Sequence, residues 1–141
     1  MNSLRSALKI IIGFCLTLCV SYPVTSKTDD FSAFEGAWVK PGVSCAEIFT
    51  WGKQGTSFRK PLRLDVPALI VTRKSITTAK ALCRIRSTSP SQDGRMFSLT
   101  CSTPLNFSPM KEVLSIAADG ALLRHSGSND RIGTRFERCR P

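Results

Sequence analysis

Four cysteines constrain the fold of this chain more than any other feature of its sequence. They stand far apart in the last hundred of its 141 residues, and none belongs to a CxxC pair. Structural zinc sites use closely spaced cysteines and histidines, whereas this chain has one histidine. We therefore expect no metal and no cofactor. The pattern predicts two disulfides, formed by Cys45, Cys83, Cys101 and Cys139.

The N-terminal segment has the pattern of a secretory signal peptide. Residues 1–9 carry two cations and no acid, residues 10–20 are apolar, and a polar stretch with small residues follows. The apolar run is too short to cross a bilayer, which takes about 20 residues. A lipoprotein is the alternative, but Phe14 and Leu18 precede the two cysteines of this segment, where a lipobox needs a small residue. We expect residues 1–26 to be removed on export to the periplasm or the extracellular space, leaving no transmembrane segment.

Cleavage at this point would leave a chain long enough for one domain. We expect a polar lead-in at 27–33 and a single domain at 34–141. The net charge would fall from +10 to +8, because Arg5 and Lys9 leave and no acid does.

Short segments of alternating apolar and polar residues predict a mainly β fold. A short helix is expected at 45–51, because Ser44 and Glu47 have the spacing of a capping box and Gly52 follows. About seven or eight strands with one short helix favour a small antiparallel barrel or sandwich. The clearest expected strands cover residues 34–39, 67–72, 75–78, 81–86, 97–101, 114–118 and 132–139.

Two hairpins are expected within this pattern. Pairing Ile85 with Leu99 puts the apolar side chains of both strands on one face and places Cys83 opposite Cys101, with residues 87–94 as the loop. A tighter hairpin is expected at Asp119-Gly120.

The hairpin register leaves two disulfide pairings open. They are 83–101 with 45–139, and 45–83 with 101–139. In the last strand, Phe136 and Cys139 are three residues apart and so face opposite sides, unless a bulge near Gly133 intervenes.

Catalysis needs a constellation of residues that this sequence does not display. It has no GxSxG elbow, and the cysteines are assigned to disulfides. The single histidine, His125, follows a hairpin strand and is expected at the surface or rim. We therefore expect a protein that is not an enzyme.

Basic residues are the most distinctive remaining feature. Arg84 and Arg86 project from one face of their expected strand, and such a face attracts anionic lipid or polysaccharide. Export and the lack of interleaved exposed aromatic residues disfavour nucleic acid as the partner. A solvated surface without a ligand is the alternative. The candidate anion-binding residues are Arg59, Lys60, Arg63, Arg73, Lys74, Lys80, Arg84 and Arg86. A second group is expected to protect an edge strand by its charge; it consists of Arg131, Arg135, Arg138 and Arg140.

Several short motifs are spaced along the chain in a definite order. They are Gly36-Ala-Trp38, Cys45, Ile76, Cys83-Arg-Ile85, Leu99-Thr-Cys101, Leu114-Ser-Ile116, the Asp119-Gly120 turn with Leu122, and Phe136-Glu-Arg-Cys139. This pattern resembles small, uncharacterised exported β-rich proteins of Gram-negative bacteria, of the alphaproteobacterial type. The resemblance implies a periplasmic or secreted β-rich domain with disulfides and supplies no ligand.

Two characterised groups are also similar in general outline. Periplasmic inhibitors of secreted metalloproteases are small barrels with an early Gly-x-Trp, and inhibitors of C-type lysozyme are small disulfide-bonded barrels. Repulsion between a basic chain and basic lysozymes argues against the second group. Three hypotheses follow: an exported envelope-accessory protein that binds anionic components through a basic face, a protease or lysozyme inhibitor with a protein target, or a barrel that carries a small ligand.

Overall fold

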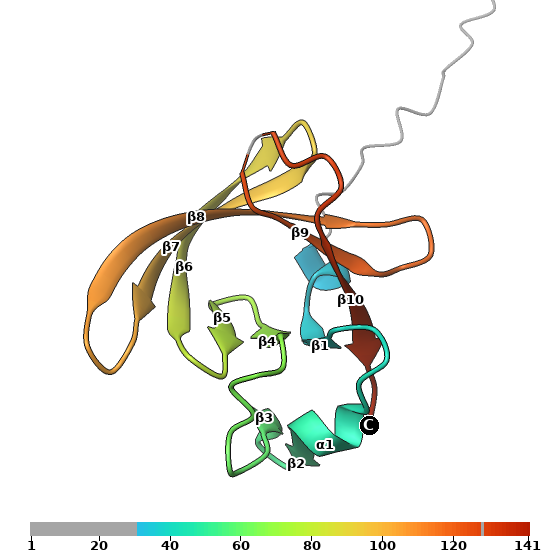
Figure 1. The fold of residues 1–141 in the computed structure, drawn as a ribbon. Coiled ribbons are helices and arrows are strands. Elements are labelled where there is room, and N and C mark those ends of the chain that lie inside the picture. The colour runs from blue at the N-terminus through green and yellow to red at the C-terminus, as the bar shows by residue number, and fades with distance from the viewer. Residues whose placement is uncertain (1–30, 128) are drawn as a thin grey trace, which may run out of the picture.

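Eight antiparallel strands close into a barrel in which the first strand, β1 (Gly36–Val39), lies between β4 and β10 (Figure 1). The computed structural model describes residues 31–127 and 129–141, so the expected signal peptide and most of the lead-in lie outside the described residues. The mainly β barrel that the sequence predicts is confirmed. The other barrel strands are β4 (Ala68–Val71), β5 (Ser75–Thr78), β6 (Leu82–Ser91), β7 (Gly94–Ser102), β8 (Phe107–Ile116), β9 (Leu122–His125) and β10 (Thr134–Cys139).

The β6–β7 hairpin has the expected register but a much shorter loop. Ile85 pairs with Leu99 and Cys83 with Cys101, as predicted. Residues 87–91, expected in the loop, instead continue β6 beyond a bulge between Ile85 and Ser87. The residues of β7 provide this segment with hydrogen-bonding partners, and such pairing outweighs the turn preference of its serines and proline. The hairpin at Asp119 is wider than expected, since residues 117–121 separate β8 from β9.

A small unit covers one outer face of the barrel. It consists of α1 (Cys45–Ile48) and the paired strands β2 (Phe49–Gly52) and β3 (Gly55–Phe58), at the bottom of Figure 1. The prediction of a helix at 45–51 is therefore wrong at its end, because Phe49 leaves the helix to pair with Phe58 and is completely buried. The expected capping box does not form either, since the Ser44 side chain makes no capping hydrogen bond.

The hydrophobic core consists of two clusters, one inside the barrel and one between the barrel wall and this small unit. Trp38 and Phe136 belong to the cluster inside the barrel, whereas Val39 and Cys139 belong to the cluster beneath α1 and β2. Phe136 and Cys139 are both buried, although they face opposite sides of β10. No bulge is needed to explain their spacing, because both faces of the strand are covered.

One end of the barrel is filled by the segment that precedes β1. Phe31, in the short 3₁₀ helix η1 (Phe31–Ala33), and Phe34 both contact the ring of Phe97, with centroids 5.8 and 5.6 Å apart. The Trp38 indole donates a hydrogen bond of 2.9 Å to the carbonyl oxygen of Phe34. The guanidinium of Arg138 lies over this indole, 4.2 Å from the ring centroid, and donates to the carbonyl oxygens of residues 33 and 35. Aromatic and charged contacts together seal this end.

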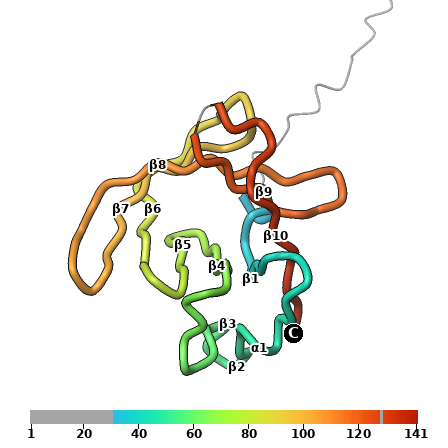
Figure 2. Tube along the Cα trace, in the orientation of Figure 1, coloured from blue at the N-terminus to red at the C-terminus, as the bar shows by residue number. Residues whose placement is uncertain are grey.

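The prediction of an edge strand at the C-terminus is wrong. Strand β10 pairs with β1 on one side and β9 on the other, because the barrel closes there (Figure 2). Two of its arginines make structural contacts instead of protecting an edge. Arg138 holds the segment before β1, and Arg135 forms an ion pair with Asp119 in the β8–β9 turn.

Two disulfides hold the fold, in the first of the two pairings left open above. Cys45 is joined to Cys139, which ties α1 to the last strand, and Cys83 is joined to Cys101 across the β6–β7 hairpin. Among the described residues, no helix is long and apolar enough to span a membrane.

Candidate functional site

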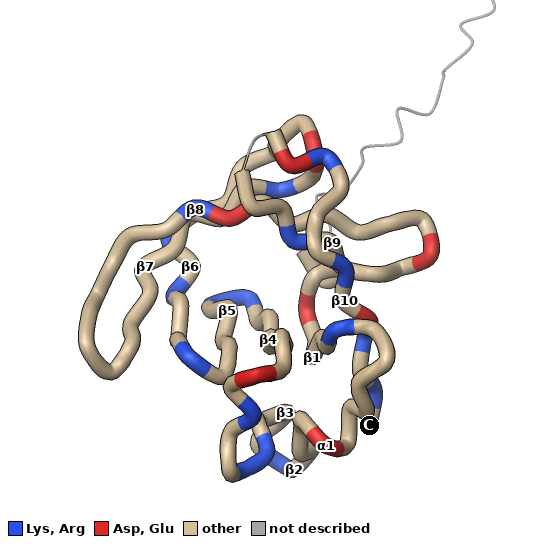
Figure 3. The backbone as a smooth tube through the Cα atoms, in the orientation of Figure 1, with Lys and Arg blue, Asp and Glu red and all other residues tan. Residues whose placement is uncertain are grey.

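The eight basic residues singled out from the sequence are distributed over several elements, as the positions of Lys and Arg along the backbone show (Figure 3). They differ in what their side chains contact. Arg59, at the end of β3, donates to the carbonyl oxygen of residue 46 at 2.8 Å. Arg63 forms an ion pair with Asp65, and Arg73 forms one with Glu35. These three therefore have local structural partners. The remaining five are Lys60 after β3, Lys74 and Lys80 in the turns on either side of β5, and Arg84 and Arg86 on β6.

The outer face of β6–β7–β8 gathers the most basic part of this set. Arg84 pairs with Thr100 in the strand register, and the Nε of Arg86 donates to the hydroxyl of the same threonine at 3.0 Å. Lys111, two positions beyond the partner of Thr100 on β8, is also exposed. The expectation that both arginines project away from Cys83 agrees with their exposure. Sequence reasoning missed Lys111, because its strand was not expected to begin before residue 114.

Exposed apolar side chains lie at the end of this same face. Register pairs join Leu82 to Ser102 and Ser102 to Phe107, so that Leu82 and Phe107 flank a serine in one row across three strands. Phe107 is 78% exposed, and Leu105, in the turn between β7 and β8, is 96% exposed. The hydroxyl of Thr103 orders this turn by accepting hydrogen bonds from the amides of residues 105 and 106.

The basic residues and the exposed apolar residues of this outer surface together form what we call the docking face. Two residues along a strand cover about 7 Å, so Arg84 stands about 7 Å above the row of Leu82, and Lys111 about twice as far above Phe107. Neither residues 82–91 nor residues 94–111 contain an acid, and the β7–β8 hairpin at the left of Figure 3 is free of charge colours around its turn. The docking face consists of Leu82, Leu105, Phe107, Arg84, Arg86 and Lys111.

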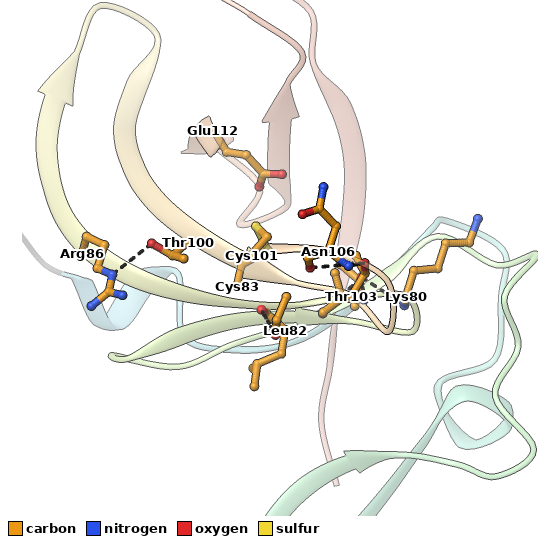
Figure 4. The surroundings of a disulfide bond; sticks show 12 residues. Lys80, Leu82, Cys83, Arg86, Thr100, Cys101, Thr103, Asn106 and Glu112 are labelled. Carbon is orange, nitrogen blue, oxygen red and sulfur yellow. Dashed lines mark hydrogen bonds between the residues drawn. A yellow bond between two sulfur atoms is a disulfide. The ribbon is translucent and has the colours of Figure 1, made fainter. Parts of the chain in front are cut away.

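A pocket of about 410 Å³ opens at the end of the barrel opposite the aromatic seal. Its inner wall includes the Cys83–Cys101 disulfide and the apolar side chains of Leu69, Ile76 and Phe136. Its rim comes from the segment before β4, the β5–β6 turn and the ends of β7 and β8. Figure 4 shows Lys80 at this end, near Thr103 and Asn106 of the neighbouring turn.

One ion pair lies at the side of this pocket. Glu112 is 9% exposed and points into the barrel toward the disulfide (Figure 4), where its Oε1 accepts a hydrogen bond from Arg124. A second depression also includes both residues, together with Lys111 and His125. Glu112 and Arg124 thus separate two hollows, and neither residue was singled out from the sequence.

His125 is buried, so the expectation that it lies at the surface or rim is wrong. It is 5% exposed; its Nδ1 donates to the carbonyl oxygen of Asp130 at 2.6 Å, and its Nε2 lies 2.9 Å from the hydroxyl of Ser115. The Asp130 carboxylate accepts hydrogen bonds from the amides of Ser126 and Gly133, which lower its pKa. With both ring nitrogens engaged, His125 fastens the loop after β9 to the barrel wall.

Within residues 31–127 and 129–141, no group of three or more histidine, cysteine, aspartate or glutamate side chains is placed to hold a metal ion. Comparisons with models of known families, with curated proteins and with solved structures gave no match. The fold and its geometry therefore carry the functional argument.

Proposed function

We propose that this is an exported, non-enzymatic envelope-accessory protein that binds anionic lipid membranes through the docking face. One observation carries the proposal: the exposed apolar side chains of Leu105 and Phe107 stand at the end of a strand face whose exposed charged residues, Arg84, Arg86 and Lys111, are all positive. Monomeric proteins rarely expose such side chains together without a partner.

The energetics of this arrangement suit a reversible association with a membrane surface. Burying a side chain such as leucine or phenylalanine contributes about 1.5–3 kcal/mol. Each cation near an anionic leaflet contributes about 1 kcal/mol. Because the cations stand about 7 Å or more behind the apolar row, they would lie near the lipid phosphates while Leu105 and Phe107 enter the apolar region.

Export is supported by the disulfides and by the signal-peptide pattern. Both bonds, Cys45–Cys139 and Cys83–Cys101, need an oxidising compartment to form and persist. The resemblance of short sequence motifs to exported proteins of Gram-negative bacteria remains part of the proposal, since the comparisons gave no match that bears on it. No specific observation favours a protease or lysozyme target, so a protein partner becomes an outcome of the experiment.

The experiment measures cosedimentation of the oxidised protein with lipid vesicles at about 50 and 300 mM salt, which span weak and strong screening. One set of vesicles contains phosphatidylcholine alone, and the other contains phosphatidylcholine mixed with phosphatidylglycerol. We expect binding to the anionic vesicles that weakens at the higher salt. Equal binding to both vesicle types, or none to either, would contradict the proposal and leave a protein target as the better hypothesis.

Two variants with matched controls locate the binding surface. Phe107→Ser should weaken vesicle binding at least ten-fold, because it removes about 1.5–3 kcal/mol of burial, whereas Ile132→Ser, at an 84% exposed position outside the docking face, should have no effect. Lys111→Gln should cost about five-fold on anionic vesicles only, and Lys53→Gln, in the β2–β3 turn, should cost much less. Equal losses in a variant and its control would show that the face is wrongly chosen.

A further inference from the structure

The barrel is blocked at one end and open at the other. Phe31 and Phe34 pack on Phe97 at the blocked end. The pocket at the open end reaches inward to the Cys83–Cys101 disulfide. A molecule entering this end therefore meets a closed floor, and this shape suits holding a small ligand better than passing one through.

The wall of the pocket is mainly apolar. The buried side chains of Leu69, Ile76 and Phe136 line it, and Val66 and Met110 add apolar surface nearer the rim. Its volume of about 410 Å³ holds about a dozen non-hydrogen atoms, taking the roughly 30 Å³ that a water molecule occupies in the liquid as a guide. Eight-stranded barrels have room for one such ligand.

The charges around the pocket favour an anionic head group on that ligand. Both acids of the lining are engaged by arginines: Asp65 with Arg63, and Glu112 with Arg124. Lys80 stands at the rim (Figure 4), is exposed, and is in none of the ion pairs formed among the described residues. An anion bound at the rim would supply the opposite charge that Lys80 lacks.

We infer that the pocket binds a single-chain anionic amphiphile, with its chain against Leu69, Ile76 and Phe136 and its head group beside Lys80. This inference goes beyond membrane docking and does not depend on it, since none of Leu82, Leu105 and Phe107 lines the pocket.

Calorimetric titration of the oxidised protein in solution, without vesicles, tests the inference. The probes are dodecanoate, dodecanol and dodecyltrimethylammonium, all below the concentrations at which they form micelles. We expect dodecanoate to bind most tightly, with a negative heat-capacity change from burial of its chain. Equal affinity for all three, preference for the cation, or no binding of dodecanoate would overturn the inference.

Variants then place the ligand. Ser108→Trp and Ala79→Trp, at two separate positions of the lining, should each abolish dodecanoate binding by filling the pocket, whereas Ser89→Trp, on the exposed far part of β6, should not. Lys80→Gln should weaken dodecanoate binding about two- to five-fold, within the range for an exposed ion pair, and leave dodecanol binding unchanged. Circular dichroism verifies that each variant is folded. Unchanged binding in a folded pocket-filling variant would overturn the inference.

The same variants distinguish this site from the docking face. Ser108→Trp should still bind anionic vesicles, and Phe107→Ser should still bind dodecanoate. Either function can therefore fail while the other holds.

Discussion

Replacing Gly94 by alanine should disrupt the close approach of β8 to the start of β7. Gly94 has a φ of 145°, and a Cβ atom there would lie 2.3 Å from the carbonyl oxygen of Leu114 and 2.7 Å from the Cβ of Ser115. Because one of these atoms belongs to the backbone, the clash cannot be relieved by rotating a side chain, and the two strands must move apart. Gly120 is the matched control: its φ is 84°, and nothing lies within 4 Å of the added atom.

The two substitutions share one cost and differ in another. A positive φ costs a residue with a side chain about 1–3 kcal/mol, and this applies to both Gly94→Ala and Gly120→Ala. Overpacking adds about 1–3 kcal/mol only at Gly94, for a total of about 2–6 kcal/mol. Domains of this size have a free energy of unfolding of about 5–15 kcal/mol, so the loss at Gly94 is a large fraction.

Urea denaturation followed by tryptophan fluorescence measures both losses, since Trp38 is completely buried in the folded barrel. A free energy of unfolding that falls no further in Gly94→Ala than in Gly120→Ala would refute the argument from the close approach of the strands.

Three further predictions concern stability and local order. Replacing Cys45 and Cys139 by alanine should lower the free energy of unfolding by about 4–5 kcal/mol, and removing the hairpin disulfide should lower it by about 3 kcal/mol, because the bonds span 94 and 18 residues. Urea denaturation shows which of the two variants loses more stability. A larger loss on removal of the hairpin disulfide would contradict the loop-length argument. Two backbone amides lower the pKa of Asp130. The stability that this carboxylate contributes to the fold is therefore present above the unfolded pKa of 3.8 and is lost as the pH falls through the lower folded value. Denaturation midpoints measured between about pH 5 and 2 should depend less on pH in Asp130→Asn than in the unaltered protein, and an unchanged pH dependence would count against this. Arg138→Ala should speed hydrogen exchange in residues 33–36, because the guanidinium no longer holds the carbonyl oxygens there; exchange equal to that of the unaltered protein would show that the clamp is unimportant.

Local alternation was enough to predict a small antiparallel barrel or sandwich and the register of one hairpin, although it left two disulfide pairings open. In the β6–β7 hairpin the apolar residues of both strands can share a face in one register, and that register places Cys83 beside Cys101. The end of α1 could not be found in this way. Its boundary depends on Phe49 pairing with Phe58 under the barrel wall, which is a tertiary contact, whereas the capping-box spacing is a purely local signal.

The candidate surfaces were predictable only in part. Arg84 and Arg86 were identified from their alternation with buried neighbours, but the apolar end of the docking face was missed. The Thr103-Pro104 pair is a turn signal that could have placed Phe107 at the start of a strand. The sequence raised a barrel that carries a small ligand only as a hypothesis and could not name the lining of the pocket, because that lining comes from strands that meet only when the barrel closes.

The position of β1 between β4 and β10 also determines when folding can be completed. β1 emerges early in synthesis, but one of its two neighbours ends at residue 139, and Cys45 finds its sulfur partner at that same residue. Before β10 has been synthesised, the chain can form hairpins but cannot close the barrel, so a nascent chain remains open between β1 and the place of β10. This order is compatible with the export proposed above, because an open chain can pass through a membrane pore in extended form and close after its last strand has crossed.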